Sequence, residues 1–247
     1  MRTFLLLCAL VSSPLIYASQ DVVAPVIKRH RLFIGISVSP DLCYRTLSYP
    51  SSYTNYEAYR NEIPKCGVTA GVQLIYAFPK LIELQAGILY SDKGYQTPIG
   101  TDWASGNGHP GIFRQKWVYD FHYLDIPLRV NFLAGKKKIR FCGGIGLTTN
   151  IFLTETSVYT EHYENGDLIT KRHYTLKNKP VDLSPLVSAG IDCRIRDRSH
   201  IRIEPTFTHN ILNTADSIVW PFSDKRNPSV KEYYWSVGLN LSYYFGL

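Results

Sequence analysis

The stretch FHYLDIPLRVNFLAG, residues 121–135, carries two patterns at once. Apolar residues take every second position from Leu124 to Phe132, and polar or charged ones, among them Asp125 and Arg129, stand between them. Because successive side chains of a β-strand point to opposite faces, this alternation predicts a strand with one apolar and one polar face. The alternation alone does not say which of the two faces points into the protein.

Seven other segments repeat this alternation, and they cover residues 32–38, 68–76, 82–91, 139–148, 183–195, 201–208 and 235–245. Tight turns follow the second, fourth and sixth of the eight segments. The connections after the first, third, fifth and seventh run to about thirty residues each, far beyond ordinary loop lengths. Short turns at one rim and long loops at the other are typical of outer-membrane barrels. The sequence therefore predicts an all-β fold, an eight-stranded antiparallel up-and-down transmembrane β-barrel.

The composition of the two faces indicates which one lies inside. The apolar face is bulky, with about five large residues a strand, enough to cross roughly 25 Å of hydrocarbon when the strand is tilted. The polar face combines small residues with four acids and four arginines, which can pair within a lumen only wide enough for side chains. We therefore predict a lumen charge network of Glu83, Asp125, Arg129, Arg140, Asp192, Arg194, Arg202 and Glu204.

Two alternatives stay open at this point. A soluble barrel of lipocalin type would turn the apolar face inward, and its outer face would then be largely Gly, Ser and Thr, with few Lys and Glu for solubility. The lumen charges, in turn, could form a proton or ion path instead of a structural core. Their balanced count and the narrow lumen favour the structural core.

The first residues, MRTFLLLCALVSSPLIYASQ, have a basic start, a short apolar core and a small residue suited to cleavage after Ala18. This pattern predicts a signal peptide over residues 1–18 and leaves a single outer-membrane barrel domain over 19–247. Removing Arg2 with the signal lowers the formal net charge from +7 to +6. No basic stripe with interleaved aromatics is present, so we expect no nucleic-acid partner and instead expect contact with anionic outer-membrane lipid.

Several motifs resemble the outer-membrane β-barrel domain of Bacteroidota, in particular the PorT-like group. They are LYSDKG (89–94), YLDIPLRV (123–130), GGIGL (143–147) and the final SVGLNLSYYFGL (236–247). The resemblance implies insertion into the outer membrane but no settled activity, and a few PorT-like members are linked to protein secretion across that membrane. The last strand also resembles the signal read by the barrel-assembly machinery, through Gly238, Leu241, Tyr243 and Phe245, although Leu247 stands where an aromatic is usual.

The cysteines raise the question of a disulfide. Cys43 and Cys66 bracket the first long loop, and the oxidising periplasm permits a bridge between them. Such a bridge would close about 22 residues and stabilise the fold by roughly 3 kcal/mol. Two separate thiols are the alternative. Cys142 and Cys193 are expected on opposite faces, and no cysteine or histidine spacing suits zinc, so no cofactor is predicted.

One grouping of residues suggests catalysis. His209, Asp216 and Ser217 are close in sequence, and a rim-sited enzyme that modifies lipid A would need a serine, a histidine and a carboxylate together. Asp216-Ser217-Ile218 also resembles the Bacteroidota O-glycosylation pattern, which makes Ser217 a candidate modification site. We expect instead a non-catalytic barrel, whose long extracellular loops bind an envelope or extracellular protein or support envelope assembly.

Overall fold

The computed structural model describes residues 31–48, 62–79, 81–103, 112–135, 138–163, 166–172, 180–196, 198–212, 218–220, 223–227 and 231–247. Within these ranges every element is a strand. None of the described residues belongs to a helix long and apolar enough to cross a membrane. The predicted signal peptide, residues 1–18, lies outside the described residues and stays a prediction.

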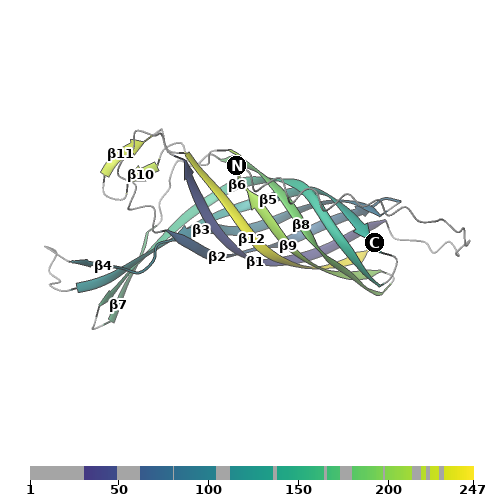
Figure 1. Ribbon diagram of the computed structural model, residues 1–247, viewed down its shortest axis with the longest axis horizontal. Coiled ribbons are helices and arrows are strands. Elements are labelled where there is room, and N and C mark those ends of the chain that lie inside the picture. The colour runs from purple at the N-terminus through teal and green to yellow at the C-terminus, as the bar shows by residue number, and fades with distance from the viewer. Residues whose placement is uncertain are drawn as a thin grey trace, which may run out of the picture.

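Eight strands close into a ring in which every neighbouring pair is antiparallel. They are β1 (Leu32–Ser48), β2 (Ile63–Ala77), β3 (Ile82–Gln96), β5 (Ile112–Ala134), β6 (Ile139–Tyr163), β8 (Val181–Arg196), β9 (Ser199–His209) and β12 (Lys231–Gly246). The first and last strands pair along most of their length, so the ring has no open edge. This confirms the predicted eight-stranded antiparallel barrel (Figure 1).

The two ends of the barrel differ. The connections β2–β3, β5–β6 and β8–β9 are short, and they lie at the end that carries the C-terminus (Figure 1). Gly135, in the turn between β5 and β6, has a φ of 115°, a conformation that glycine adopts without steric cost. We call this end the short-turn rim and the opposite end the long-loop rim.

The connections at the long-loop rim are not simple loops, which corrects the sequence prediction. β5 begins at Ile112, nine residues before the predicted segment 121–135, and β6 ends at Tyr163, 15 residues after the predicted segment 139–148. β4 (Gly100–Trp103) pairs with β5, and β7 (Gly166–Arg172) pairs with β6, which gives a four-stranded extension projecting past the barrel (Figure 1). A separate small hairpin joins β10 (Ile218–Trp220) to β11 (Ser223–Asn227).

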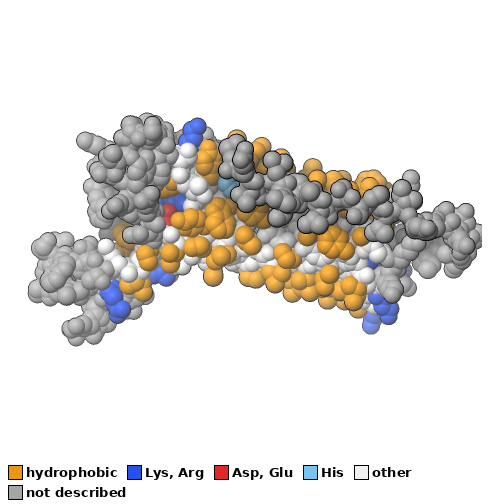
Figure 2. Space-filling view, viewed as in Figure 1, with side chains coloured by type: hydrophobic (Ala, Val, Ile, Leu, Met, Phe, Trp, Pro, Cys, Tyr) orange, Lys and Arg blue, Asp and Glu red, His pale blue; other side chains and the backbone are white. Residues whose placement is uncertain are grey.

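The apolar side chains cover the outside of the barrel. Ile36, Ile88 and Leu128 are 55–65% exposed, whereas Gln85 and Arg129, on the other face, are at most 4% exposed. Figure 2 shows the result on the face in view, where hydrophobic side chains gather along the barrel wall. A surface this apolar is stable in hydrocarbon and not in water, so the polar face is the inner one.

Candidate functional site

A network of six charged side chains fills the lumen near the short-turn rim. The Arg202 guanidinium is fully buried, and its Nη2 lies 2.6 Å from Glu83 Oε2 and 3.1 Å from Asp192 Oδ2. Asp192 also pairs with Arg140 at 2.6 Å. We name this set the short-turn network; it comprises Glu83, Arg129, Arg140, Asp192, Arg202 and Glu204, with Arg129 paired to Glu204 at 2.6 Å. Three acids match three arginines, so the network is neutral as a whole.

The amide of Gln85 ties this network to the barrel wall. Its Oε1 accepts hydrogen bonds from Arg129 Nε and Asn131 Nδ2, both at 2.8 Å. Its Nε2 donates to Gln73 Oε1 at 2.6 Å and to the Tyr244 hydroxyl at 3.0 Å. Because Gln73 and Tyr244 also bond to each other, charged and neutral groups form one connected layer across the lumen.

Asp125 belongs to a second, separate layer nearer the middle of the barrel. Its Oδ2 pairs with Lys93 Nζ at 2.9 Å, and Lys93 also donates to Asn150 at 2.8 Å. A cavity of about 60 Å³ lies beside this pair. Asp125 Oδ1 and Thr148 Oγ1 line the cavity, and neither has a hydrogen-bond partner within the described residues. A polar space of this size has room for about four water molecules.

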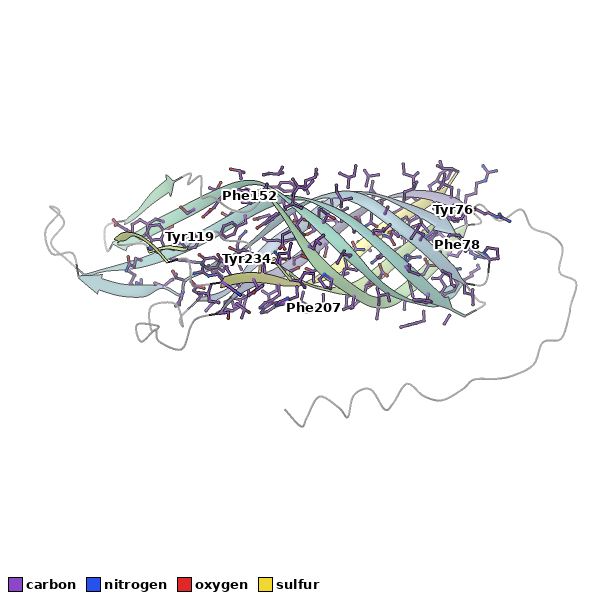
Figure 3. All side chains as sticks on the ribbon, turned by 90° about the horizontal axis from the view of Figure 1, so that it is seen from above. Tyr76, Phe78, Tyr119, Phe152, Phe207 and Tyr234 are labelled. Carbon is purple, nitrogen blue, oxygen red and sulfur yellow. The ribbon has the colours of Figure 1, made fainter. Side chains whose placement is uncertain are left out.

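Aromatic rings close the lumen above this cavity, toward the long-loop rim. We name them the aromatic cap; they are Tyr95, Phe121, Tyr123 and Tyr234, each at most 5% exposed. The Arg45 guanidinium lies 3.7 Å from the centre of the Tyr95 ring and donates to Glu232 Oε1 at 2.8 Å. It also forms a forked pair with Glu62. Tyr119 packs against the cap, and Figure 3 labels Tyr119 and Tyr234 in this part of the molecule.

Glu155 is the least compensated carboxyl group of the cap region. It follows Leu153, the last large lipid-facing side chain of β6, and therefore lies beyond the apolar band. The side chain is 2% exposed, and its Oε2 has no hydrogen-bond partner within the described residues. Burial, with a further contribution from Glu232, raises the pKa of Glu155 to about 8.

The lumen is thus filled at two levels, by ion pairs below and by aromatic rings with Arg45 above. Paired and hydrogen-bonded charges of this kind hold one another in place. In the part of the chain that the structure describes, the arrangement suits a structural core and offers no reactive constellation of nucleophile, base and orienting group.

Seven of the eight residues predicted for the lumen charge network form ion pairs, but not as one network. Six constitute the short-turn network, and Asp125 pairs with Lys93 instead. Arg194 is a correction: it is exposed at the end of β8, opposite His200, and no ion pair to it is found among the described residues. Strand alternation predicted that Arg194 lies on the inner face of its strand. It did not predict that Arg194 lies at the open end of the barrel, where water reaches the side chain.

The structure decides the open question of the disulfide, since Cys43 and Cys66 are both free. Cys43 lies opposite Lys65, and Cys66 lies opposite Leu42, so the two cysteines are offset by one residue on paired strands. Cys43 is buried and Cys66 is exposed, because such an offset points the two side chains to opposite faces. Cys142 is buried and Cys193 is half-buried, on strands where they are not partners.

The candidate catalytic grouping cannot be assembled from the described residues. Asp216 and Ser217, the latter also the candidate O-glycosylation site, lie outside them. His209 ends β9, and its ring stacks on Tyr233 at 6.3 Å between centroids.

Sequence reasoning missed the buried charged residues above the short-turn network: Asp41, Arg45, Glu62, Lys65, Lys93, Glu155, Asp182 and Glu232. They lie where the large apolar residues thin out, so apolar alternation does not mark them. Continuing the inward parity of each strand past its apolar segment would have found Arg45 and Lys93, which lie an even number of positions from Ser39 and Gln85, inward residues of the same strands.

Fold and lumen together define a closed, filled membrane barrel. The family model described as outer membrane protein beta-barrel domain matches residues 30–216, and the chain belongs to this family. A search of curated proteins found no match. Among solved structures, the outer membrane protein OprG of Pseudomonas aeruginosa is 11% identical, covering 89% of this chain and 98% of its own, with a TM-score of 0.49.

Two further solved structures are similar at the same low level of identity. Neisserial surface protein A is 10% identical over 87% of this chain and 97% of its own, with a TM-score of 0.42. The outer membrane protease OmpT of Escherichia coli is 9% identical over 89% of this chain and 98% of its own, with a TM-score of 0.42. These likenesses concern the fold alone.

Proposed function

We propose that this outer-membrane barrel is non-catalytic and binds an extracellular or envelope protein through the structure at its long-loop rim. The observation that carries the proposal is the contrast between a filled lumen and the four-stranded extension outside the apolar band. A lumen occupied by ion pairs and aromatic rings leaves no room for a substrate. Binding therefore takes place at the parts of the protein that project from the membrane.

The extension has the form of a binding surface. β4 and β7 are the outer strands of the ten-stranded order, and within the described residues each pairs on one side only. Unpaired strand edges present rows of backbone donors and acceptors, to which an extended segment of another protein can add. Packed aromatic rings strengthen the base of the extension, with Trp117 and Tyr159 tilted against each other at 4.4 Å between centroids.

The test is site-specific photo-crosslinking on intact cells. A photoreactive amino acid at Thr160, on the extension part of β6, should give a discrete protein adduct. The same group at Ile145, on the lipid-facing part of β6, is the matched control and should give none. Adducts from neither position, or the same adducts from both, would contradict binding through the extension.

Three finer proposals rest on sequence motifs. Membership of the PorT-like group of Bacteroidota is supported by the motifs at 89–94 and 123–130, and a role in secretion follows from that resemblance alone. Recognition by the barrel-assembly machinery is supported by the pattern that includes Gly238 and Phe245. A lipid A-modifying activity is the catalytic alternative, and unchanged lipid A masses in a Ser217→Ala strain would remove its support.

A further inference from the structure

Exposed basic side chains gather along the short-turn rim. We name them the basic rim; they are Arg31, Lys138, Arg194, Arg196 and Arg198, all exposed. Backbone hydrogen bonds show that they occupy neighbouring strand ends. Arg194 N donates to Lys138 O at 2.8 Å, Gly246 N to Arg198 O at 2.6 Å and Ala77 N to Arg31 O at 2.7 Å. The basic rim therefore extends from β6 through β8, β9 and β12 to β1 and β2.

Few negative charges oppose this rim. The nearest acidic side chains, Glu83 and Asp192, point into the lumen, where Arg202 and Arg140 neutralise them. Apart from the C-terminal carboxylate of Leu247, no exposed carboxylate lies at this rim among the described residues. The turn sequences also contain Lys80, Lys136, Lys137 and Asp197, which lie outside the described residues.

The long-loop rim is different, because its buried basic groups have carboxylate partners. Lys65 lies 2.6 Å from Asp92 and 2.5 Å from Asp120, and Arg45 is held between two glutamates. Arg114 and Lys231 are exposed at the long-loop rim as well, but the larger group of exposed basic side chains lies at the short-turn end. Figure 2 shows basic side chains beside the edge of the hydrophobic band at that end.

The basic rim lies at the depth of lipid headgroups. Ile139 and Ile195, next to Lys138 and Arg194 in sequence, are 64% and 51% exposed and mark the edge of the lipid-facing band. Tyr76 and Phe78 lie at the same end, with ring centroids 4.8 Å apart (Figure 3). Tyrosine and tryptophan rings favour the interface between hydrocarbon and water, and exposed phenylalanine beside them extends this apolar boundary. Basic groups just beyond it meet the phosphates of the lipids.

We propose that the basic rim binds anionic phospholipid headgroups of the leaflet that surrounds the short turns. Guanidinium groups offer planar, forked donors that match a phosphate, and a row of them on adjacent strand ends can hold several headgroups. In the orientation of the proposed function, with short turns toward the periplasm, these lipids belong to the periplasmic leaflet. That assignment of the leaflet rests on the proposed function, whereas the binding itself does not.

The experiment is native mass spectrometry of the barrel folded in detergent and supplied with phosphatidylglycerol, phosphatidylethanolamine or phosphatidylcholine. The wild-type protein should retain phosphatidylglycerol at least about threefold more than either zwitterionic lipid. The triple variant Arg194→Gln, Arg196→Gln, Arg198→Gln should lose this preference. The matched control, Arg114→Gln with Lys231→Gln, removes two exposed charges at the long-loop rim and should keep it.

Heat-modifiable migration on gels verifies that each variant is folded. If the triple variant does not fold, the single variant Arg196→Gln is used instead, and it should halve the preference for phosphatidylglycerol. Equal retention of the three lipids, or full preference in the triple variant, would overturn the proposal. Orientation is tested separately, by labelling Arg198→Cys on intact cells with an impermeant maleimide, with Cys66 and Cys193 changed to Ser. Labelling of the cysteine at position 198 on intact cells would contradict the proposed orientation, whereas the lipid preference would be unaffected.

Discussion

Arg202 holds the short-turn network together at the scale of single residues. It is fully buried and shares its charge between Glu83 and Asp192. Ion pairs this deep add little net stability compared with well-packed apolar residues, but removing one partner leaves the other charges uncompensated. The network therefore favours one arrangement of the side chains in the lumen, since each of its members depends on the others being present.

We expect Arg202→Ala to lower the free energy of unfolding by about 3–5 kcal/mol, because buried Glu83 loses its ion-pair partner and Asp192 loses one of two. Urea unfolding in lipid vesicles, followed by gel migration, measures the change. Arg194→Ala is the matched control, since Arg194 is exposed, and its effect should stay within about 0.5 kcal/mol. Equal losses in the two variants would contradict the structural role of the network.

Glu155 gives stability a dependence on pH. Its pKa is about 8 in the fold against 4.5 for a free side chain, so between these values the folded state retains a proton that the unfolded state has lost. Stability from this group therefore falls as pH rises through that window and is constant above it.

In urea unfolding, Glu155→Gln should become more stable than the wild type between pH 5 and pH 8, by on the order of 1–3 kcal/mol. Glu161→Gln, on the same strand but partly exposed, is the control. Parallel stability curves for the wild type and Glu155→Gln would show that Glu155 ionises freely in the fold.

The wrong placement of Arg194 and the open question of the disulfide have a common reason. The sequence showed that Cys43 and Cys66 lie near each other and that Arg194 has inward parity, and both statements hold in the structure. Neither statement contains the register between strands or the depth of a residue along the barrel axis. A shift of one residue in the register decides whether two cysteines face each other. A few residues along the strand decide whether an arginine is buried or reaches water.

At the scale of strands, the alternation predicted those parts of the fold that a membrane requires. All eight barrel strands were recognised, because lipid demands a large apolar residue at every second position. β4, β7 and the extensions of β5 and β6 were not, because outside the membrane the outer face is free to carry residues such as Thr154 and Thr156. The long-loop rim was for that reason predicted as loops.

β3 and β5 approach each other closely at Gly94, in the region of the aromatic cap. Its φ is 149°, and a Cβ placed there would lie 1.9 Å from the carbonyl oxygen of Tyr119, far inside contact distance. Gly94→Ala should therefore cost about 1–3 kcal/mol of stability in urea unfolding, as strained backbone positions do. A Cβ on Gly100 would meet nothing within 4 Å, so Gly100→Ala should change little. Similar effects of the two substitutions would show that the pairing yields easily.

At the scale of the whole molecule, charge is distributed in a way that composition does not reveal. The net charge of the chain predicted contact with anionic lipid but not its place. In the described residues, carboxylates such as Glu155 and Glu232 are concentrated inside, toward the long-loop rim, while exposed arginines lie at the short-turn rim. Only the closed ring brings residues as distant in sequence as Arg31 and Arg198 to one edge.

The filled lumen leads to a prediction about conduction. The short-turn network crosses the section of the barrel, and the aromatic cap with Arg45 closes it again nearer the long-loop rim. Between them lies a cavity of about 60 Å³, which has room for only a few water molecules. We expect the purified wild-type protein to form no stable channel in planar bilayers, because eight strands leave an interior that side chains fill.

Substitution should loosen this interior without turning it into a pore. Arg129→Ala removes the partner of Glu204 and the donor to Gln85, so its main effect should be a loss of stability of about 3–5 kcal/mol. Single-channel recordings of the variant should show at most brief, irregular openings, since the Arg202 contacts and the aromatic cap remain. Large and steady currents from the wild-type protein would refute the filled lumen. They would mean that ion pairs and rings separate in the membrane, or that several barrels assemble around a shared passage.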